Sequence, residues 1–199
     1  LFPAVRTKVL TNIANGTLQS SMKRDYSQFD KEYYDRFYER EKSRASGPKE
    51  FRRLATFILS YLHYLQIPLT EVLDLGCGLG RWKAALTAHD PSIQYTGVDP
   101  SPYLSEKYGW NQTTVDGFRS RKEYDLVICQ DVLPYLKPRQ IKDALANIAR
   151  LTKGAAYIQV VSEQDWKNDI VDPTRTDHAM NQIDADWYRK AFSRHFINC

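Results

Sequence analysis

The feature that most constrains this chain is a glycine-rich turn that follows a short apolar segment. Residues 71–75 read Glu-Val-Leu-Asp-Leu, residues 76–80 read Gly-Cys-Gly-Leu-Gly, and a stretch of helical composition begins at Arg81. Glycines permit positive φ angles and let a ligand approach the backbone closely. The helix that follows presents unpaired N–H groups toward the turn. The segment therefore predicts a strand, a tight turn and a helix, with a nucleotide-like ligand in the turn.

Spacing separates the kinds of glycine turn that bind nucleotides. The dinucleotide fingerprint G-x-G-x-x-G fits Gly76 and Gly78, but Arg81 stands where its third glycine belongs. A phosphate-binding P-loop needs Gly-Lys-Ser/Thr after its second glycine, and the chain has none there. A nicotinamide-dependent oxidoreductase is therefore disfavoured.

The remaining pattern, residues 74–80, resembles the first motif of class I S-adenosylmethionine (SAM)-dependent methyltransferases, Asp-Leu-Gly-Cys-Gly-x-Gly. The resemblance implies that SAM is the cofactor and S-adenosylhomocysteine (SAH) its product. It also implies that Asp74 helps to hold the amino end of the methionine. The turn against the methionine and ribose would then consist of Gly76, Cys77, Gly78 and Gly80.

A second strand-like segment ends in an acid at a suitable separation. Residues 94–101 read Gln-Tyr-Thr-Gly-Val-Asp-Pro-Ser, and Asp99 lies 25 positions after Asp74 (99 minus 74). An acid about 20 residues past a glycine turn can accept hydrogen bonds from both ribose hydroxyls. We therefore expect Asp99, with Pro100 beside it, to bind the ribose. The alternative is a helix N-cap or turn residue.

Composition bounds the class of protein. The chain has 199 residues, of which 42% are hydrophobic and 26% charged, as expected for one globular domain. Its net charge of +4 is too small to predict a nucleic-acid-binding surface. No apolar run approaches the roughly 18 residues of a membrane span. The three cysteines lack the spacing of metal ligands, so we expect no metal site and a cytoplasmic location.

Strand and helix patterns alternate between residues 71 and 161 and predict an α/β domain with a parallel sheet. The expected strands are 71–75, 94–99, 110–118, 124–133 and 155–161, with a helix over 138–151. The resemblance implies a single Rossmann-like, three-layer αβα domain with strand order 3-2-1-4-5. Residues 67–199 would form this core, with 196–199 as a partial strand at its C-terminal edge.

Two segments precede the predicted core. Residues 1–21 are polar and begin without methionine, so we interpret them as a leader that is either foreign to the natural protein or partly ordered. Residues 22–66 are expected to form a helical region, with an aromatic helix over 26–44 and a second helix over 51–65. The aromatic helix either packs on the core or covers the cofactor as a lid. Tyr33 is the candidate to line the site.

Polar residues follow the third and fourth strands. Asp116 and Gly117 end the third, where the resemblance places an acid near the adenine amine, and a plain Asp-Gly turn is the equal alternative. Gln130 and Asp131 end the fourth, whose end faces the transferring methyl in the resembling family. They should lie at the ligand-binding edge of the sheet.

A polar segment over residues 162–181 follows the fifth strand, and we expect it to shape the acceptor pocket. A solvated connection is the alternative. Candidate bases are Asp131 and His178, with Tyr135 less favoured. His178 could equally be an exposed loop residue, and Asp131 could cap a turn.

The absence of several motifs narrows the class of molecule that could accept the methyl group. The chain has no Asn/Asp-Pro-Pro-Tyr/Phe after the fourth strand, no Pro-Cys nucleophile and no paired glutamates there. These motifs mark nucleobase and protein-arginine methyltransferases. The sequence thus favours a SAM-dependent methyltransferase acting on an O, N or S atom of a small molecule. The alternative is a non-catalytic protein of the same fold that binds SAM or a partner.

Overall fold

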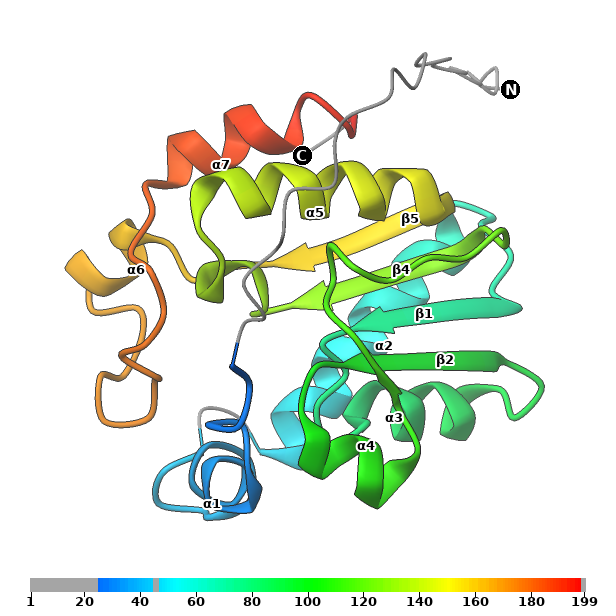
Figure 1. Ribbon diagram of the computed structural model, residues 1–199. Coiled ribbons are helices and arrows are strands. Elements are labelled where there is room, and N and C mark those ends of the chain that lie inside the picture. Colours follow the sequence, from blue (N-terminus) through cyan, green and yellow to red (C-terminus); the bar gives the residue numbers. More distant parts are fainter. Residues whose placement is uncertain (1–24, 45–46, 198–199) are drawn as a thin grey trace.

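A five-stranded parallel sheet forms the centre of the computed structural model, which describes residues 25–44 and 47–197. The strand order is β3-β2-β1-β4-β5, which confirms the predicted 3-2-1-4-5 arrangement (Figure 1). All four neighbouring pairs are parallel. The strands are β1 (Glu71–Leu75), β2 (Gln94–Asp99), β3 (Asn111–Gln112), β4 (Tyr124–Gln130) and β5 (Thr152–Gln159).

Helices cover both faces of this sheet and give the three-layer architecture (Figure 1). Helices α2 and α3 pack on one face, and α5 and α7 pack on the other. The helical elements are α1 (Lys31–Tyr34), a π-helical turn η1 (Asp35–Glu39), α2 (Pro48–Tyr64), α3 (Arg81–His89), α4 (Pro102–Tyr108), a 3-10 turn η2 (Leu133–Tyr135), α5 (Pro138–Leu151), α6 (Glu163–Lys167) and α7 (Ala185–Phe192).

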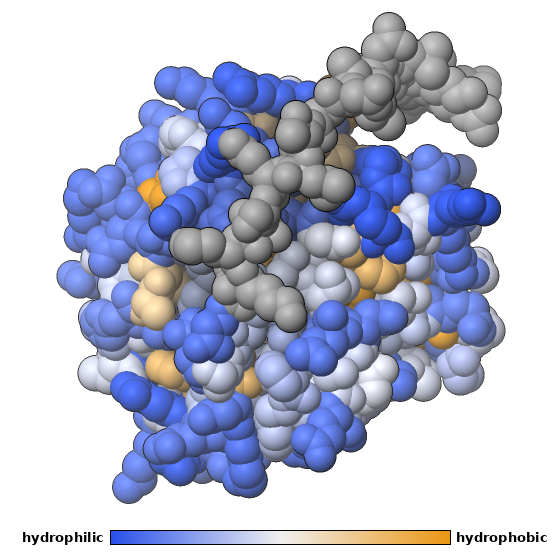
Figure 2. All heavy atoms as spheres, in the orientation of Figure 1, coloured by the Kyte–Doolittle hydropathy of each residue, from blue (hydrophilic) through white to orange (hydrophobic). Residues whose placement is uncertain are grey.

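Alternation along the central strands supplies both halves of the core. Val72 and Leu126 belong to the hydrophobic cluster beneath α2 and α3, whereas Leu73 and Val127 belong to the one beneath α5 and α7. All four side chains are completely buried, as expected for central parallel strands that are covered on both faces. In the view of Figure 2, hydrophilic residues cover most of the surface and hydrophobic ones are scattered.

The N-terminal helix is shorter than the predicted 26–44. Asp30 caps α1 by accepting a hydrogen bond from the Tyr33 N–H at 2.9 Å, so the helix begins at Lys31. It widens into the π-helical turn and ends at Glu39. We call residues 26–38 the aromatic segment. The predicted leader, residues 1–21, lies outside the described residues.

Several expected strands also differ. The fourth ends at Gln130 instead of residue 133, and the fifth spans Thr152–Gln159 instead of 155–161. The third was predicted over 110–118 but spans only Asn111–Gln112, because residues 115–117 form a turn. At the C-terminal edge, a strand was expected over 196–199. The described part of this stretch, 196–197, contains no strand, and residues 198–199 lie outside the description.

The strands place their carboxyl ends along one edge of the sheet, on the side where α1 and α6 lie (Figure 1). In the register, Leu75 pairs with Val98, and Gln130 pairs with Gln159. The glycine turn, the acid that ends β2 and the polar residues that follow β4 therefore meet at this edge, where ligands bind in open α/β sheets.

Candidate active site

The glycine turn after β1 is fixed to the neighbouring strand by its own backbone. The N–H groups of Gly76 and Cys77 both donate to the carbonyl of Val98, at 2.7 and 3.0 Å. Gly76 has φ +82°, and a Cβ at this position would overlap the side chain of Val132. Only glycine both adopts this positive φ without strain and leaves room for the Val132 side chain. The turn therefore has one conformation at this point, set by packing against β2 and the segment after β4.

The cavity side of the turn is left open for a ligand. Gly78 has φ +51°, and the nearest atoms to a Cβ there would be ring carbons of Tyr34 and Tyr38, both 3.9 Å away. Trp110 supports the turn from behind, because its indole N–H donates to the Gly78 carbonyl at 2.9 Å. Its ring also lies where a Cβ on Gly80 would be. The backbone is thus held on one side and accessible on the other.

Asp74 ends β1 as a buried carboxylate beside this turn. One of its oxygens accepts a hydrogen bond from the Tyr95 hydroxyl at 2.6 Å, and only 2% of the residue is exposed. Burial raises the pKa of Asp74 to about 7, although the hydrogen bond from Tyr95 opposes the shift. The nearby Asp99 adds a smaller upward contribution. Asp74 is therefore partly protonated near neutral pH and would gain from a cationic ligand.

Asp99 organises the backbone around it. One oxygen accepts from the Gly78 N–H at 3.0 Å, and the other accepts from the Ser101 N–H at 2.9 Å and from the Tyr34 hydroxyl at 3.4 Å. Burial raises the pKa of Asp99, and these hydrogen bonds oppose that shift. The contact with Tyr34 is long and therefore weak. It is the contact that a ribose hydroxyl could replace at the lowest cost.

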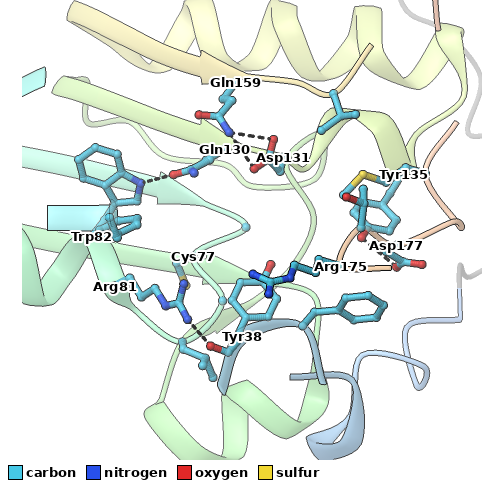
Figure 3. Close-up of a pocket in the computed structure, with 18 of the residues that line it drawn as sticks. Tyr38, Cys77, Arg81, Trp82, Gln130, Asp131, Tyr135, Gln159, Arg175 and Asp177 are labelled. Carbon is cyan, nitrogen blue, oxygen red and sulfur yellow. Dashed lines mark hydrogen bonds between the residues drawn. The ribbon is translucent and has the colours of Figure 1, made fainter. Parts of the chain in front are cut away.

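Two glutamine amides at the ends of β4 and β5 have orientations set by their donors. The indole N–H of Trp82 can only donate, and it donates to Gln130 Oε1 at 2.8 Å. Tyr157 donates its hydroxyl to Gln159 Oε1 at 2.6 Å. Each amide oxygen is therefore engaged by an aromatic residue. The amide nitrogens remain as donors at the edge of the sheet (Figure 3).

Asp131 receives these donors. Gln159 Nε2 lies 3.0 and 3.3 Å from its two carboxylate oxygens, and the backbone N–H of Asp131 donates to the Gln159 carbonyl at 2.9 Å. Asp131 has φ +57°, an uncommon conformation outside glycine. Burial raises its pKa to about 6, while hydrogen bonds from Gln159 and Gln130 lower it. Asp131 is therefore a fixed, half-buried carboxylate whose pKa is raised toward neutral pH.

Two adjoining cavities open at this edge. The larger, about 370 Å³, is bordered by Asp74, the glycine turn and part of the segment after α6, and the smaller, about 80 Å³, by Asp99 and Pro100. The residues that line both lie at their junction. They are Tyr33, Tyr38, Gly76, Gly78, Gln130, Asp131 and Tyr135.

The aromatic segment covers the glycine turn from the open side. Tyr33 and Tyr38 line both cavities, and Tyr34 lines the smaller one. Arg81, the first residue of α3, donates to the Tyr38 carbonyl and lies over the Tyr38 ring at 5.4 Å (Figure 3). The segment thus packs over the glycine turn, and its role as a lid over the cofactor stays a prediction.

A chain of hydrogen bonds crosses the wall of the larger cavity. The hydroxyls of Tyr33 and Tyr135 lie 2.8 Å apart. Tyr135 donates to Asp177 Oδ2 at 2.9 Å (Figure 3). Asp177 Oδ1 accepts from the Ala179 N–H at 2.9 Å. Three separate segments therefore meet here: the aromatic segment, the turn after β4 and the loop after α6.

Most residues proposed from the sequence come together at the cavities, but four do not. Gly80 lies outside both linings, where the Trp110 ring packs against it. His178 is exposed, with its ring Nε2 2.9 Å from the Pro173 carbonyl, and it lines neither cavity. Asp116 and Gly117 also lie outside both linings, where Thr114 and Val115 are found instead. The physical reason is the early turn after β3, which carries Asp116 past the smaller cavity.

Sequence reasoning missed several lining residues. Gln159 ends β5 as Gln130 ends β4, so a polar residue at a strand end was the signal that could have found it. Trp82, directly after the glycine turn, had no motif to identify it. Arg175 and Asp177 lie in the predicted polar segment, next to the histidine that was chosen. Tyr135, a minor candidate from the sequence, lines both cavities.

No helix within the described ranges combines the length and apolar character that crossing a membrane requires. In the same ranges, no group of three or more His, Cys, Asp or Glu residues is placed to hold a metal ion.

Solved structures with this fold include several methyltransferases. A SAM-dependent methyltransferase from Clostridium acetobutylicum aligns with a TM-score of 0.60 at 13% identity, covering 82% of this chain and 85% of the other. The plantazolicin methyltransferase in complex with a substrate analogue and SAH aligns with a TM-score of 0.61 at 15% identity, covering 84% of this chain and 68% of the other. These likenesses establish the fold.

Curated relatives match part of the chain. The ubiquinone biosynthesis O-methyltransferase of Rickettsia canadensis is 28% identical over 113 residues, and the one of Rickettsia felis is 29% identical over the same length. Each match covers 50% of this chain, and the chain spans about half the length of these relatives (46% and 45%).

A family model described as a methyltransferase domain matches residues 30–196, which include the aromatic segment from Asp30 onward, the whole sheet and α7. The match covers most of the chain, and it agrees with both the strand order and the motif at residues 74–80. The chain therefore belongs to the methyltransferase domain family.

Proposed function

We propose that this chain is a SAM-dependent methyltransferase that acts on a small-molecule acceptor. The observation that carries the proposal is the joint placement of the glycine turn, Asp74 and Asp99 around adjoining cavities at the carboxyl edge of the sheet. Membership of the methyltransferase domain family supports it. The names of the curated relatives favour transfer to oxygen.

The residues at the edge fit SAM group by group. The buried carboxylate of Asp74 suits the ammonium of the methionine, because a cation would offset the cost of burying its charge. Asp99 suits a ribose hydroxyl, which can take the place of the long contact with Tyr34. The open backbone at Gly78 leaves space between them. Pro100, Thr114 and Val115 border the smaller cavity and would lie beside the nucleoside.

The residues at the junction of the cavities would promote transfer of the methyl group to the acceptor. When bound, SAM supplies a methyl group on a positively charged sulfur that leaves as the neutral thioether of SAH. Asp131 and Tyr33 line the junction, where a carboxylate would stabilise positive charge and a hydroxyl would orient the acceptor. The aromatic segment covers the turn and excludes water. Gln130, held by Trp82, keeps an amide donor at this point.

The acceptor would enter the part of the larger cavity bordered by the loop after α6. Arg175, Asp177 and Met180 line it there. A cavity of about 370 Å³ suits a small molecule, since ligand pockets measure roughly 300–1,000 Å³. Cys77 and Cys129 are unpaired and buried, which supports a reducing compartment such as the cytoplasm.

Titration calorimetry with SAH on the whole chain tests the proposal, with NADH as a matched control ligand. We expect saturable heat with SAH and none with NADH. Incubation with SAM and a panel of hydroxyl, amine and thiol compounds, followed by mass spectrometry, should then reveal one methylated product class. No heat with either SAM or SAH would refute the assignment. Binding of SAM without methylation of any panel compound would favour the non-catalytic alternative.

A further inference from the structure

The hydrogen-bonded chain of Tyr33, Tyr135 and Asp177 has a defined direction. Tyr135 has one hydroxyl proton, and it donates that proton to Asp177 Oδ2. The 2.8 Å contact between the two hydroxyls then requires Tyr33 to be the donor and Tyr135 the acceptor. The hydroxyl oxygen of Tyr33 therefore keeps its lone pairs for a ligand. It presents an acceptor, not a donor, at the junction of the two cavities.

Packing holds the three groups in this arrangement. Phe29 meets the Tyr33 ring edge-on at 4.9 Å and the Tyr135 ring edge-on at 5.5 Å. Asp177 is held by the Ala179 N–H on its second oxygen. Tyr33, Tyr135 and Asp177 are all half-buried, so the Asp177 carboxylate retains access to solvent.

We propose that Tyr33, Tyr135 and Asp177 form a proton relay that removes the proton from a hydroxyl group of the acceptor. The inference rests on the proposed function and adds to it the substrate class: an oxygen nucleophile that binds in its protonated form. Tyr33 is the catalytic residue, because it would touch the acceptor. Tyr135 and Asp177 act through it.

The step balances without a further reactant. The acceptor's O–H bond breaks and its proton passes to the Tyr33 oxygen, the Tyr33 proton passes to Tyr135, and the Tyr135 proton passes to the Asp177 carboxylate. The acceptor oxygen keeps the electron pair with which it bonds to the methyl carbon. Asp177, now neutral, returns its proton to solvent.

Other groups at the site are less suited to this role. Both oxygens of Asp131 already accept hydrogen bonds from the Gln159 amide, which leaves them less available to an acceptor hydroxyl. His178 lies outside the cavities. Burial also raises the pKa values of Tyr33 and Tyr135, so both remain phenols at neutral pH and transmit a proton rather than act as phenolate bases.

The direction of the hydrogen bonds can be tested by binding alone. The probe is 4-nitrophenol, whose phenol and phenolate forms have different absorption spectra, titrated with the SAH-loaded protein across pH. We expect the wild type to prefer the neutral phenol by on the order of tenfold, because Tyr33 can only accept and Asp177 repels the anion. In Tyr135→Phe, the Tyr33 proton is freed to donate. The preference should then disappear or invert toward the phenolate.

Matched variants separate this effect from a loss of folding. Tyr108→Phe removes a hydroxyl outside both cavities and should keep the wild-type preference. Asp177→Asn removes the final proton acceptor and should also reduce the preference for phenol. It serves as the second test if Tyr135→Phe does not fold. Unchanged SAH affinity in each variant shows that the cofactor site is intact.

Activity gives a second readout. In the wild type, methylation of unsubstituted phenol should proceed, whereas Tyr135→Phe should lose it and retain activity on the ionised nitrophenol. The relay is overturned if the wild type prefers the phenolate, if Tyr135→Phe keeps the preference for phenol, or if a wild type that binds SAH binds no hydroxyl probe. Failure to bind SAH would instead count against the proposed function.

Discussion

The two halves of the site are built in different ways. The half proposed to bind the cofactor, called the cofactor half, consists of β1, β2 and the turn at 76–80, and its contacts are mostly backbone hydrogen bonds and buried carboxylates. The half proposed to bind the acceptor, called the acceptor half, consists of the ends of β4 and β5 and the loop after α6, and side chains from distant segments hold it together. The first half is therefore constrained by chain geometry, whereas the second can vary by changing side chains without altering the sheet.

The largest expected effect comes from the backbone of the cofactor half. Gly76→Val should lower the free energy of unfolding by about 3 kcal/mol or more and abolish SAH binding, because a side chain there overlaps Val132 at a positive φ. Denaturant unfolding and calorimetry measure both. Gly109→Ala is the control: φ is +71° but no atom lies within 4 Å, so about 1 kcal/mol is expected. Equal losses in both would show that packing at the turn is unimportant.

A smaller loss of SAH affinity is expected for Asp99→Ala. The substitution removes charged hydrogen-bonded contacts worth roughly 1.5–3 kcal/mol, which corresponds to about 10- to 100-fold in SAH affinity. Asp125→Ala is a matched control, since Asp125 is also buried but receives the N–H groups of Thr70 and Glu71 at the opposite end of β1. It should lower stability without changing the SAH affinity of the folded protein. Unchanged SAH affinity in Asp99→Ala would refute the ribose assignment.

The pH dependence of SAH binding should report on Asp74. The pKa of Asp74 is raised to about 7, so its carboxylate is ionised above that pH and protonated below it. Because the proposed partner is an ammonium, SAH affinity should fall as pH decreases from about 8 to about 6, approaching tenfold per unit below the pKa. Calorimetry across this range measures the slope. Asp74→Asn should bind more weakly and lose the slope; a variant with the wild-type slope would assign the titration elsewhere.

The smallest effect belongs to the acceptor half. Arg175 pairs with Asp172 at 3.4 Å, and both side chains are about half exposed, so Arg175→Ala should change stability by about 0–1 kcal/mol. SAH affinity should not change, whereas the KM of a methylated acceptor should. Thermal unfolding and calorimetry check the first two expectations. A marked loss of SAH affinity would show that the two halves are coupled.

The same contrast explains what the sequence could predict. The strands and the glycine turn with Asp74 depend on residues that are close in sequence, so local patterns predicted them. The strand order, which pairs Val72 with Leu126, was predicted only through the resemblance of residues 74–80 to a known family. The contact between Tyr33 and Tyr135 joins residues 102 positions apart, and that between Tyr135 and Asp177 joins residues 42 apart. The periodicity of residue types along a sequence does not indicate contacts between residues so far apart. His178 was the predicted candidate base, but its neighbour Asp177 lines the cavity, because one position in a loop decides which side chain reaches it.

Regular elements were misjudged where a cap or a turn decided the outcome. Asp30 starts α1 later than aromatic spacing suggested, and the turn at residues 115–117 shortened β3. Aromatic periodicity identifies a helical face but not the residue at which a helix begins. The fold was therefore predictable to the level of strand order, and the acceptor half was not.

The left-handed backbone conformation of Asp131 lowers the stability of the fold, while its carboxylate serves the proposed function. A non-glycine residue in this conformation costs on the order of 1 kcal/mol that glycine would recover. Selection for a more stable fold would thus favour glycine at position 131, whereas selection for the proposed function would keep the carboxylate. An acid at this position in a variant library screened for thermal stability alone should be among the first to disappear. If the acid persists under a screen for activity, position 131 is one where stability and function favour different residues.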